Sequence, residues 1–191
     1  ENVYLEGRKQ YALQLAKSLL PGVTGTATER KLRHLLTIGE PPPVTTLAGT
    51  TGDSAYLSDV EWTDAKTGWG EPARNVYYIG RGVRHAVFLE TANTFFPKGL
   101  FAHAPSQYVF KLDGKWKTFE AVGGLQAGVA AIGSAVFIVK ADGRERYRST
   151  LLSGSAEVEI SVDVSDVDTL ELIVESGKQG NACCWSIWGN P

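Results

Sequence analysis

The stretch EVEISVDV, residues 157–164, alternates apolar and polar side chains at every step. Its four aliphatic residues, from Val158 to Val164, fall on one face of an extended chain, and its acidic residues and serine fall on the other. A period of two is typical of a half-buried β-strand. Residues 169–175 (TLELIVE) repeat the pattern with leucine and valine on one face. The two runs therefore predict neighbouring strands that each bury one side.

Similar short runs continue through most of the chain without an intervening helical pattern. Closely spaced strands that lack crossover helices must pair antiparallel, and about nine of them bury their apolar faces best as two packed sheets. The dipeptides Asp142-Gly143 and Asp113-Gly114 are expected at tight hairpin turns. We predict an all-β fold, a jelly-roll-like antiparallel β-sandwich over residues 54–191. The further strands are expected at residues 56–62, 75–79, 85–90, 107–112, 116–122, 135–140 and 183–188.

The first 39 residues have a different pattern. Residues 4–20 carry apolar side chains at helical spacing, and Pro21-Gly22 ends the run. A second helix begins at a capping box of Thr26 and Glu29 and ends at Gly39. Residues 40–53 start with Glu-Pro-Pro-Pro and continue rich in threonine and glycine, as a linker would. We therefore predict a helical appendage at 1–39 and a linker at 40–53.

Composition excludes several classes of protein. The formal net charge is -2 and the charges are scattered, so no basic face is available for nucleic acid. No apolar run is long enough for membrane insertion. The chain starts at Glu1 and contains no methionine, which favours a mature form or an excised piece and leaves secretion open. Cys183 and Cys184 are adjacent, which favours two thiols over a strained disulfide, and the histidines show no zinc-ligand spacing with them.

Several motifs occur together in a fixed order. YLSDVEW at 56–62 and GWG at 68–70 precede KGLFAHA at 98–104, and the strand pair around Asp142-Gly143 is followed by a final strand near Trp185. In this combination the chain resembles the NPCBM family, carbohydrate-binding modules first noted beside family-98 glycoside hydrolases. The resemblance covers about residues 54–191 and leaves the helical appendage outside it.

The resemblance implies a β-sandwich of bacterial origin that binds galactose-type or related sugars. It implies a non-catalytic module attached to a glycoside hydrolase or another large extracytoplasmic protein, whether secreted, periplasmic or on the cell surface. Some members carry a calcium ion with a structural role, so a structural calcium ion is the one cofactor that the resemblance suggests, and its ligands here are unknown.

The chain departs from the family pattern at two places. Many members have Gly-x-Asp-Asp after the long central strand, where this chain has residues 123–126, Gly-Gly-Leu-Gln. Many read Asp-His-Ala-Asp-Trp near the end, where residues 181–185 are Asn-Ala-Cys-Cys-Trp. If the missing acids and histidine hold sugar hydroxyls or an ion, their loss puts the usual ligand in doubt.

Sugar recognition requires an aromatic face for the apolar side of a pyranose and fixed donors and acceptors for its hydroxyls. Trp69 lies between two glycines and Trp188 lies next to Gly189-Asn190, so each is a candidate for an exposed loop and also for the core. His103, Gln126 and Asn181 are the candidate polar contacts, although each is also consistent with an ordinary structural role. Trp62 and Trp185 are expected to face the core.

No motif of a nucleophile with a base, a phosphate-binding loop or a dinucleotide fingerprint is present, so we expect no enzyme activity. The function predicted is a carbohydrate-binding module whose partners are a glycan and the other domains of its host. The alternative is a structural or protein-interaction sandwich whose sugar site has degenerated. A hydrolase fragment is a third reading, which would require paired carboxylates in a cleft.

Overall fold

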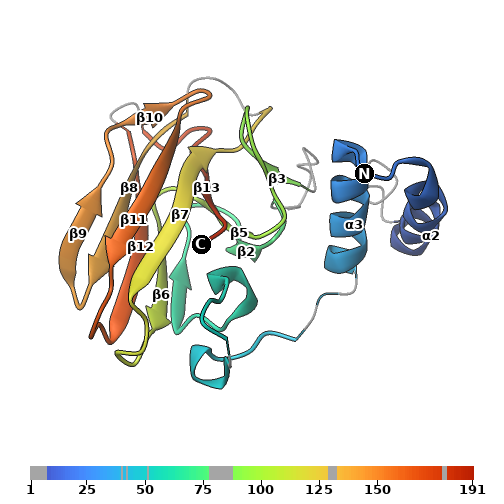
Figure 1. Ribbon diagram of the computed structural model, residues 1–191. Coiled ribbons are helices and arrows are strands. Elements are labelled where there is room, and N and C mark those ends of the chain that lie inside the picture. Colours follow the sequence, from blue (N-terminus) through green and yellow to red (C-terminus); the bar gives the residue numbers. More distant parts are fainter. Residues whose placement is uncertain are drawn as a thin grey trace.

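Two antiparallel sheets stacked face to face form the body of the molecule (Figure 1). The computed structural model describes residues 8–39, 41, 43–50, 52–77, 88–128, 133–177 and 180–191. Sheet 1 has the strand order β1-β6-β12-β8-β10, with β9 also paired to β8, and sheet 2 has the order β11-β7-β13-β5-β2. A separate two-stranded ribbon consists of β3 and β4. The predicted all-β sandwich is confirmed.

The strands of sheet 1 are β1 (Asp64–Lys66), β6 (Ser106–Lys111), β8 (Ser134–Ala141), β9 (Arg144–Arg148), β10 (Leu152–Ser153) and β12 (Thr169–Ser176). Those of sheet 2 are β2 (Ala73–Arg74), β5 (Gly99–His103), β7 (Thr118–Leu125), β11 (Glu157–Asp163) and β13 (Trp185–Gly189). The ribbon is β3 (Leu89–Glu90) and β4 (Phe95–Phe96).

The alternating runs form strands as their pattern predicts. In β11, Ile160 and Val162 are buried between the sheets, whereas Glu159, Ser161 and Asp163 are exposed. The strand β12 lies in the centre of sheet 1, paired with β6 on one side and β8 on the other. Apolar side chains from the two inner faces fill the space between the sheets in one continuous core.

A second apolar cluster covers part of the outer face of sheet 2. Phe101 and Ile187 point away from the sandwich interior because they alternate with the inward-facing Leu100 and Trp188. Leu89 and Phe96 from the β3–β4 ribbon pack over them. Sheet 2 is therefore buried on both faces along part of its length.

The helical arm consists of α2 (Lys9–Leu19), a short 3₁₀ helix (Leu20–Gly22) and α3 (Ala27–Gly39). The capping hydroxyl of Thr26 accepts from the N–H of Glu29 at 3.2 Å, and the Glu29 carboxylate accepts from Gly25 N–H at 2.5 Å. The predicted capping box is thus confirmed with one change, because Glu29 reaches Gly25 instead of Thr26. The helix α3 ends at Gly39, as predicted.

The arm contacts the sandwich through α3, and α2 lies outside α3 (Figure 1). The Nζ of Lys31 lies 2.6 Å from the Glu90 carboxylate, and the Nε2 of His34 lies 2.8 Å from the carbonyl oxygen of Asn75. Leu35 is in an apolar cluster with Phe88. The arm is therefore held by a few side-chain contacts with the β3–β4 ribbon and the Asn75 segment.

The segment predicted as a linker also contacts the sandwich. Thr45 donates its N–H to Asp59 at 3.2 Å and accepts from Glu61 N–H at 2.8 Å, which forms a parallel bridge with Val60. A 3₁₀ helix at Leu47–Gly49 follows, and Leu47 belongs to the main core. The division of the chain at 39 and 53 stays a prediction, and the described part of this segment is bound to the sandwich at these points.

Some predicted strands are wrong. Residues 56–62 contain a 3₁₀ helix at Leu57–Asp59, in which the buried Leu57 and Val60 are three residues apart and so lie on the same side of the turn. Asn75 has φ +60°, which ends the extended conformation there, and residues 78–79 lie outside the described part. Of residues 85–90, only Leu89–Glu90 is a described strand, since 85–87 are also outside it.

The two predicted hairpin turns have different outcomes. Asp142-Gly143 joins the paired strands β8 and β9 with positive φ at both residues, so that hairpin is confirmed. Asp113-Gly114 also has positive φ at both residues, but it connects β6 of sheet 1 to β7 of sheet 2. The turn is present, and the prediction that it closes a hairpin is wrong.

Candidate functional site

Three rings meet at one end of the outer face of sheet 2. His103 in β5 and Trp185 in β13 are register partners, and Trp69 comes from the loop between β1 and β2. Trp185 lies in the middle: its ring centroid is 4.6 Å from that of His103 and 5.2 Å from that of Trp69, and both contacts are edge-on. We call Trp69, His103 and Trp185 the rim cluster.

The loop that carries Trp69 is fastened to the end of β5. The hydroxyl of Thr67 lies 2.9 Å from the carbonyl oxygen of Trp69 and accepts from the N–H of His103 at 3.1 Å. Gly68 donates its N–H to the carbonyl oxygen of His103 at 2.9 Å. Backbone and hydroxyl contacts therefore fix the backbone at Trp69 relative to His103.

Trp69 is 45% exposed, and it is the one exposed tryptophan in the part of the chain that the structure describes. Its neighbour Trp185 is half-buried and stacks on Phe101, with ring planes 13° apart and centroids separated by 5.8 Å. An indole that is held in place and open to solvent can accept the apolar face of a planar or saturated ring.

His103 is buried, with 6% of its surface exposed. Burial lowers its pKa below the ordinary value of 6.5, so the ring is neutral at pH 7. Within the described residues its Nδ1 has no hydrogen-bond partner. A buried polar atom without a partner is uncommon in proteins. A hydrogen bond between the ring and the Ala104 backbone acts against the lowering of the pKa.

Gln126 lies beside Trp185 across the strands of sheet 2, because its N–H donates to the carbonyl oxygen of Trp185 at 2.9 Å. Its side chain, however, is buried: the amide donates to the carbonyl oxygen of Phe88 at 3.1 Å and accepts from Glu90 N–H at 3.3 Å. The side-chain amide of Gln126, which was predicted to contact a sugar, thus holds the β3–β4 ribbon on sheet 2.

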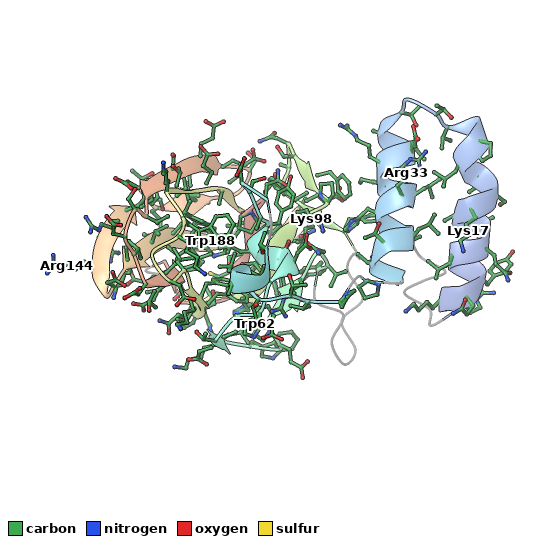
Figure 2. All side chains as sticks on the ribbon, turned by 60° about the horizontal axis from the view of Figure 1, so that its bottom comes forward. Lys17, Arg33, Trp62, Lys98, Arg144 and Trp188 are labelled. Carbon is green, nitrogen blue, oxygen red and sulfur yellow. The ribbon has the colours of Figure 1, made fainter. Side chains whose placement is uncertain are left out.

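Trp188 is not in an exposed loop, so that interpretation is wrong. It is 1% exposed and packs edge-on against Phe137, with centroids 5.0 Å apart, in the middle of the sandwich (Figure 2). Asn181 is exposed in the loop that leads into β13, as predicted for a loop residue. The structure therefore brings Trp69, His103 and the backbone of Gln126 together and places Trp188 on the opposite face of sheet 2.

Trp185 was predicted to face the core, and this is wrong for the space between the sheets. Its position in β13 is three residues from Trp188, so the two side chains lie on opposite faces of sheet 2. Two residues an odd number of positions apart in one strand face opposite sides of the sheet. This rule alone would have shown that only one of the two tryptophans can face the space between the sheets. Trp62 does border the main core, where it is half-buried against Tyr108.

Metal ligands do not gather at this end of the sheet. Throughout the described residues, no group of three or more His, Cys, Asp or Glu side chains could hold a metal ion. The calcium ion that the family resemblance implies stays a prediction. No helix in the described residues has the length and apolar character that crossing a bilayer requires.

Residues 53–191 match the NPCBM/NEW2 domain. The chain belongs to this family. The NPCBM chain is 29% identical over 149 residues to a Renibacterium salmoninarum protein named "Putative endo-alpha-N-acetylgalactosaminidase". That match covers 77% of this chain and 10% of the relative, so the chain spans about a tenth of the relative's length.

Solved carbohydrate-binding modules share the sandwich. The CBM51 module of Clostridium perfringens GH95, in complex with methyl-galactose, is 28% identical with a TM-score of 0.60, over 71% of this chain and 96% of that one. The tandem CBM51 modules of Sp3GH98, a family 98 glycoside hydrolase of Streptococcus pneumoniae, are 22% identical with a TM-score of 0.61, over 79% of this chain and 50% of theirs. The NPCBM resemblance seen in the sequence is thereby confirmed.

A third structure, CBM51-2 of Clostridium perfringens ZmpB in complex with GlcNAc, is 23% identical with a TM-score of 0.61, over 71% of this chain and 30% of that one. These relatives are bacterial, and they are carbohydrate-binding modules within larger proteins. At this level of likeness, the NPCBM chain has the fold of an accessory module.

Proposed function

We propose that the NPCBM domain is a non-catalytic carbohydrate-binding module that holds a larger extracytoplasmic protein against galactose-type glycans. The observation that carries this proposal is the exposed indole of Trp69 beside the buried, neutral ring of His103. The named ligands of the solved relatives, methyl-galactose and GlcNAc, support the substrate class. The bacterial carbohydrate-active relatives support an extracytoplasmic location.

Each ring of the rim cluster has a distinct part in this proposal. The apolar C–H face of a pyranose stacks on Trp69, and a sugar hydroxyl hydrogen-bonds to the Nδ1 of His103. Trp185 contacts both rings edge-on and supports them from below the surface. Asn181, exposed in the loop before β13, provides a further amide for hydroxyls. The host gains effective concentration at the glycan even when one module binds weakly.

Calorimetric titration with methyl β-galactoside, compared with methyl β-GlcNAc and methyl β-GalNAc, tests the proposal. The Trp69→Ala variant should bind the preferred sugar at least tenfold more weakly, which corresponds to about 1.4 kcal/mol. Tyr11→Ala is the matched control, because Tyr11 is 55% exposed on α2, away from the rim cluster, and its loss should leave the affinity unchanged. Equal loss in both variants, or none in Trp69→Ala, would contradict a site at the rim cluster.

A second candidate is a structural or protein-interaction sandwich with a degenerate sugar site. Two observations favour it: the side chain of Gln126 is used to hold the β3–β4 ribbon, and Trp188 is in the core. On this reading all three sugars give flat titrations with the intact chain. A measurable heat from any of them, lost in Trp69→Ala, excludes it.

A further inference from the structure

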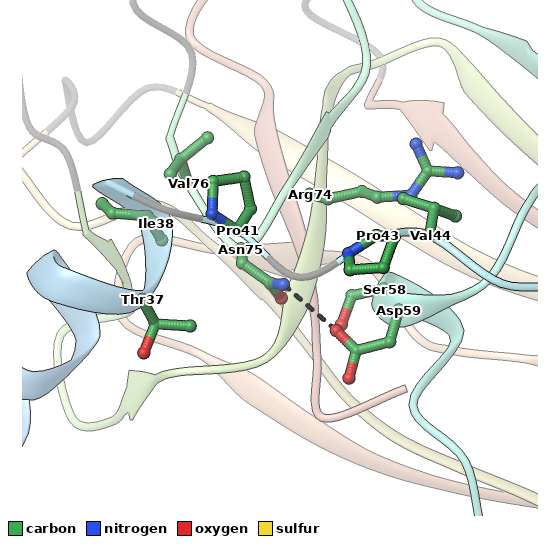
Figure 3. Close-up of a pocket in the computed structure, with 10 residues that line it drawn as sticks. All are labelled: Thr37, Ile38, Pro41, Pro43, Val44, Ser58, Asp59, Arg74, Asn75 and Val76. Carbon is green, nitrogen blue, oxygen red and sulfur yellow. Dashed lines mark hydrogen bonds between the residues drawn. The ribbon is translucent and has the colours of Figure 1, made fainter.

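A cavity of about 310 Å³ lies where the end of α3 and the segment after it meet the sandwich (Figure 3). None of its ten lining residues belongs to the rim cluster. Five of the lining residues precede the part of the chain that matches the family: Thr37, Ile38, Pro41, Pro43 and Val44. The cavity is therefore a product of the arm and the sandwich together.

One wall of the cavity is apolar. Ile38 contributes from the last turn of α3, Pro41, Pro43 and Val44 from the segment that follows, and Val76 from the sandwich. Pro41, Pro43 and Val44 are exposed, so the cavity opens to solvent on this side. Proline and aliphatic surfaces of this kind accept the C–H face of a small molecule.

The polar lining comes mainly from the sandwich. Ser58 is 2% exposed, and within the described residues its Oγ has no hydrogen-bond partner. The amide of Asn75 is fixed next to it: its Oδ1 accepts from Gly99 N–H at 3.0 Å, and its Nδ2 lies 3.4 Å from the Asp59 carboxylate (Figure 3). The cavity therefore combines polar groups of the sandwich with the apolar lining.

The charges around this polar lining largely offset one another. Asp59 accepts from the Nζ of Lys98 with both carboxylate oxygens, each at 2.6 Å. The guanidinium of Arg74 lies 3.1 Å from the centre of the Trp62 ring and donates to the carbonyl oxygen of Val60 at 3.0 Å. The Glu61 carboxylate also acts electrostatically on Arg74, so two acidic and two basic groups surround the polar lining. Within the described residues the Nε of Arg74 has no hydrogen-bond partner. This balance of charge favours a neutral ligand that carries hydrogen-bond acceptors over a strongly charged one.

We propose that this cavity is a second ligand site, which takes a small neutral polyhydroxylated molecule about the size of one sugar ring. The volume supports this size, because small-molecule sites begin at about 300 Å³. A ligand that carries both hydroxyls and C–H groups matches this lining and gives Ser58 Oγ a partner. The proposal does not depend on sugar binding at the rim cluster.

NMR titration of the full chain with myo-inositol and with methyl β-galactoside tests the second site. The side-chain amide of Asn75 should shift in a saturable way with at least one probe, both in the wild type and in Trp69→Ala. Val44→Trp should weaken this titration at least tenfold, because Val44 is 41% exposed and a larger ring there fills the cavity from outside. Leu151→Trp, at a 54% exposed site away from the cavity, is the control and should titrate like the wild type.

Three results would overturn the second site. The Asn75 amide could stay unmoved by both probes up to their solubility limits, Val44→Trp could titrate unchanged, or Trp69→Ala could abolish the Asn75 shift. The last result would assign the response to the rim cluster. The indole resonance of Trp69 reports on that site separately, so failure of the rim proposal and failure of the second site give different spectra.

Discussion

Replacing Gly68 by alanine should impair the rim cluster without removing any side chain from it. A Cβ on Gly68 would lie 2.7 Å from the carbonyl oxygen of Ala104 and 2.7 Å from Cδ of Pro105. Ordinary contact begins at 3.4 Å, so the Trp69 loop and the end of β5 must separate by about 0.7 Å. Both close neighbours belong to the backbone or a proline ring, which cannot rotate away. We expect the free energy of unfolding to fall by about 1–3 kcal/mol.

The same displacement should weaken sugar binding, because the N–H of Gly68 bonds to the carbonyl oxygen of His103 and the next residue is Trp69. Guanidinium unfolding followed by tryptophan fluorescence measures the stability, and calorimetry with methyl β-galactoside measures the affinity. Gly52→Ala is the control, since a Cβ there meets its nearest atom at 3.6 Å. If Gly68→Ala unfolds and binds like Gly52→Ala, the contact between the loop and β5 does not position Trp69.

Three further predictions concern buried groups. Trp188→Ala should lower the free energy of unfolding by about 3–5 kcal/mol in guanidinium titration, because the ring is 1% exposed in the core; an undiminished stability would contradict this placement. Gln126→Leu should lower it by about 1–3 kcal/mol by leaving Phe88 and Glu90 without their partner, and a selective loss of sugar affinity would instead assign the amide to the ligand. Burial lowers the pKa of His34 below 6.5, so the unfolded chain binds a proton at this residue more readily than the folded chain. The free energy of unfolding, measured by urea titration, should therefore decrease as pH falls from about 7 to about 5. The decrease should be smaller in His34→Gln, and a decrease of the same size in this variant would assign the effect to other groups.

The sandwich was predictable wherever one face of a strand is buried and the other is solvated. In β11 the exposed Glu159 and Ser161 mark the solvated face, and the pattern gives the strand to within one residue of its end. In β5 all five residues are buried, because the sheet is covered on both sides there, so the period of two disappears. The strand β9 has the sequence RERYR, whose exposed position needs few apolar residues, so only the Asp142-Gly143 turn and not an alternating run indicated it.

The candidate site was only partly predictable, because residue type does not specify on which side of a sheet a residue lies. The flanking glycines correctly indicated an open position for Trp69, and the burial of His103 follows from its place in β5. The same reasoning failed for Trp188, because the adjacent Gly189-Asn190 does not imply exposure when the last strand is central in its sheet. The cavity beside α3 could not be foreseen, because it depends on how the arm docks.

Thr45 and Leu47 contact the sandwich although they precede the part of the chain that matches the family. The family match begins at residue 53, yet Leu47 is only 7% exposed in the main core, and Thr45 makes two backbone hydrogen bonds to the sandwich. A fragment that begins at residue 53 would lack Leu47 and leave a cavity in the main core. Its free energy of unfolding should be lower by about 2–5 kcal/mol, as for truncation of a buried leucine. Recombinant fragments and domain swaps should be cut upstream of Val44, so that Thr45 and Leu47 stay attached to the sandwich.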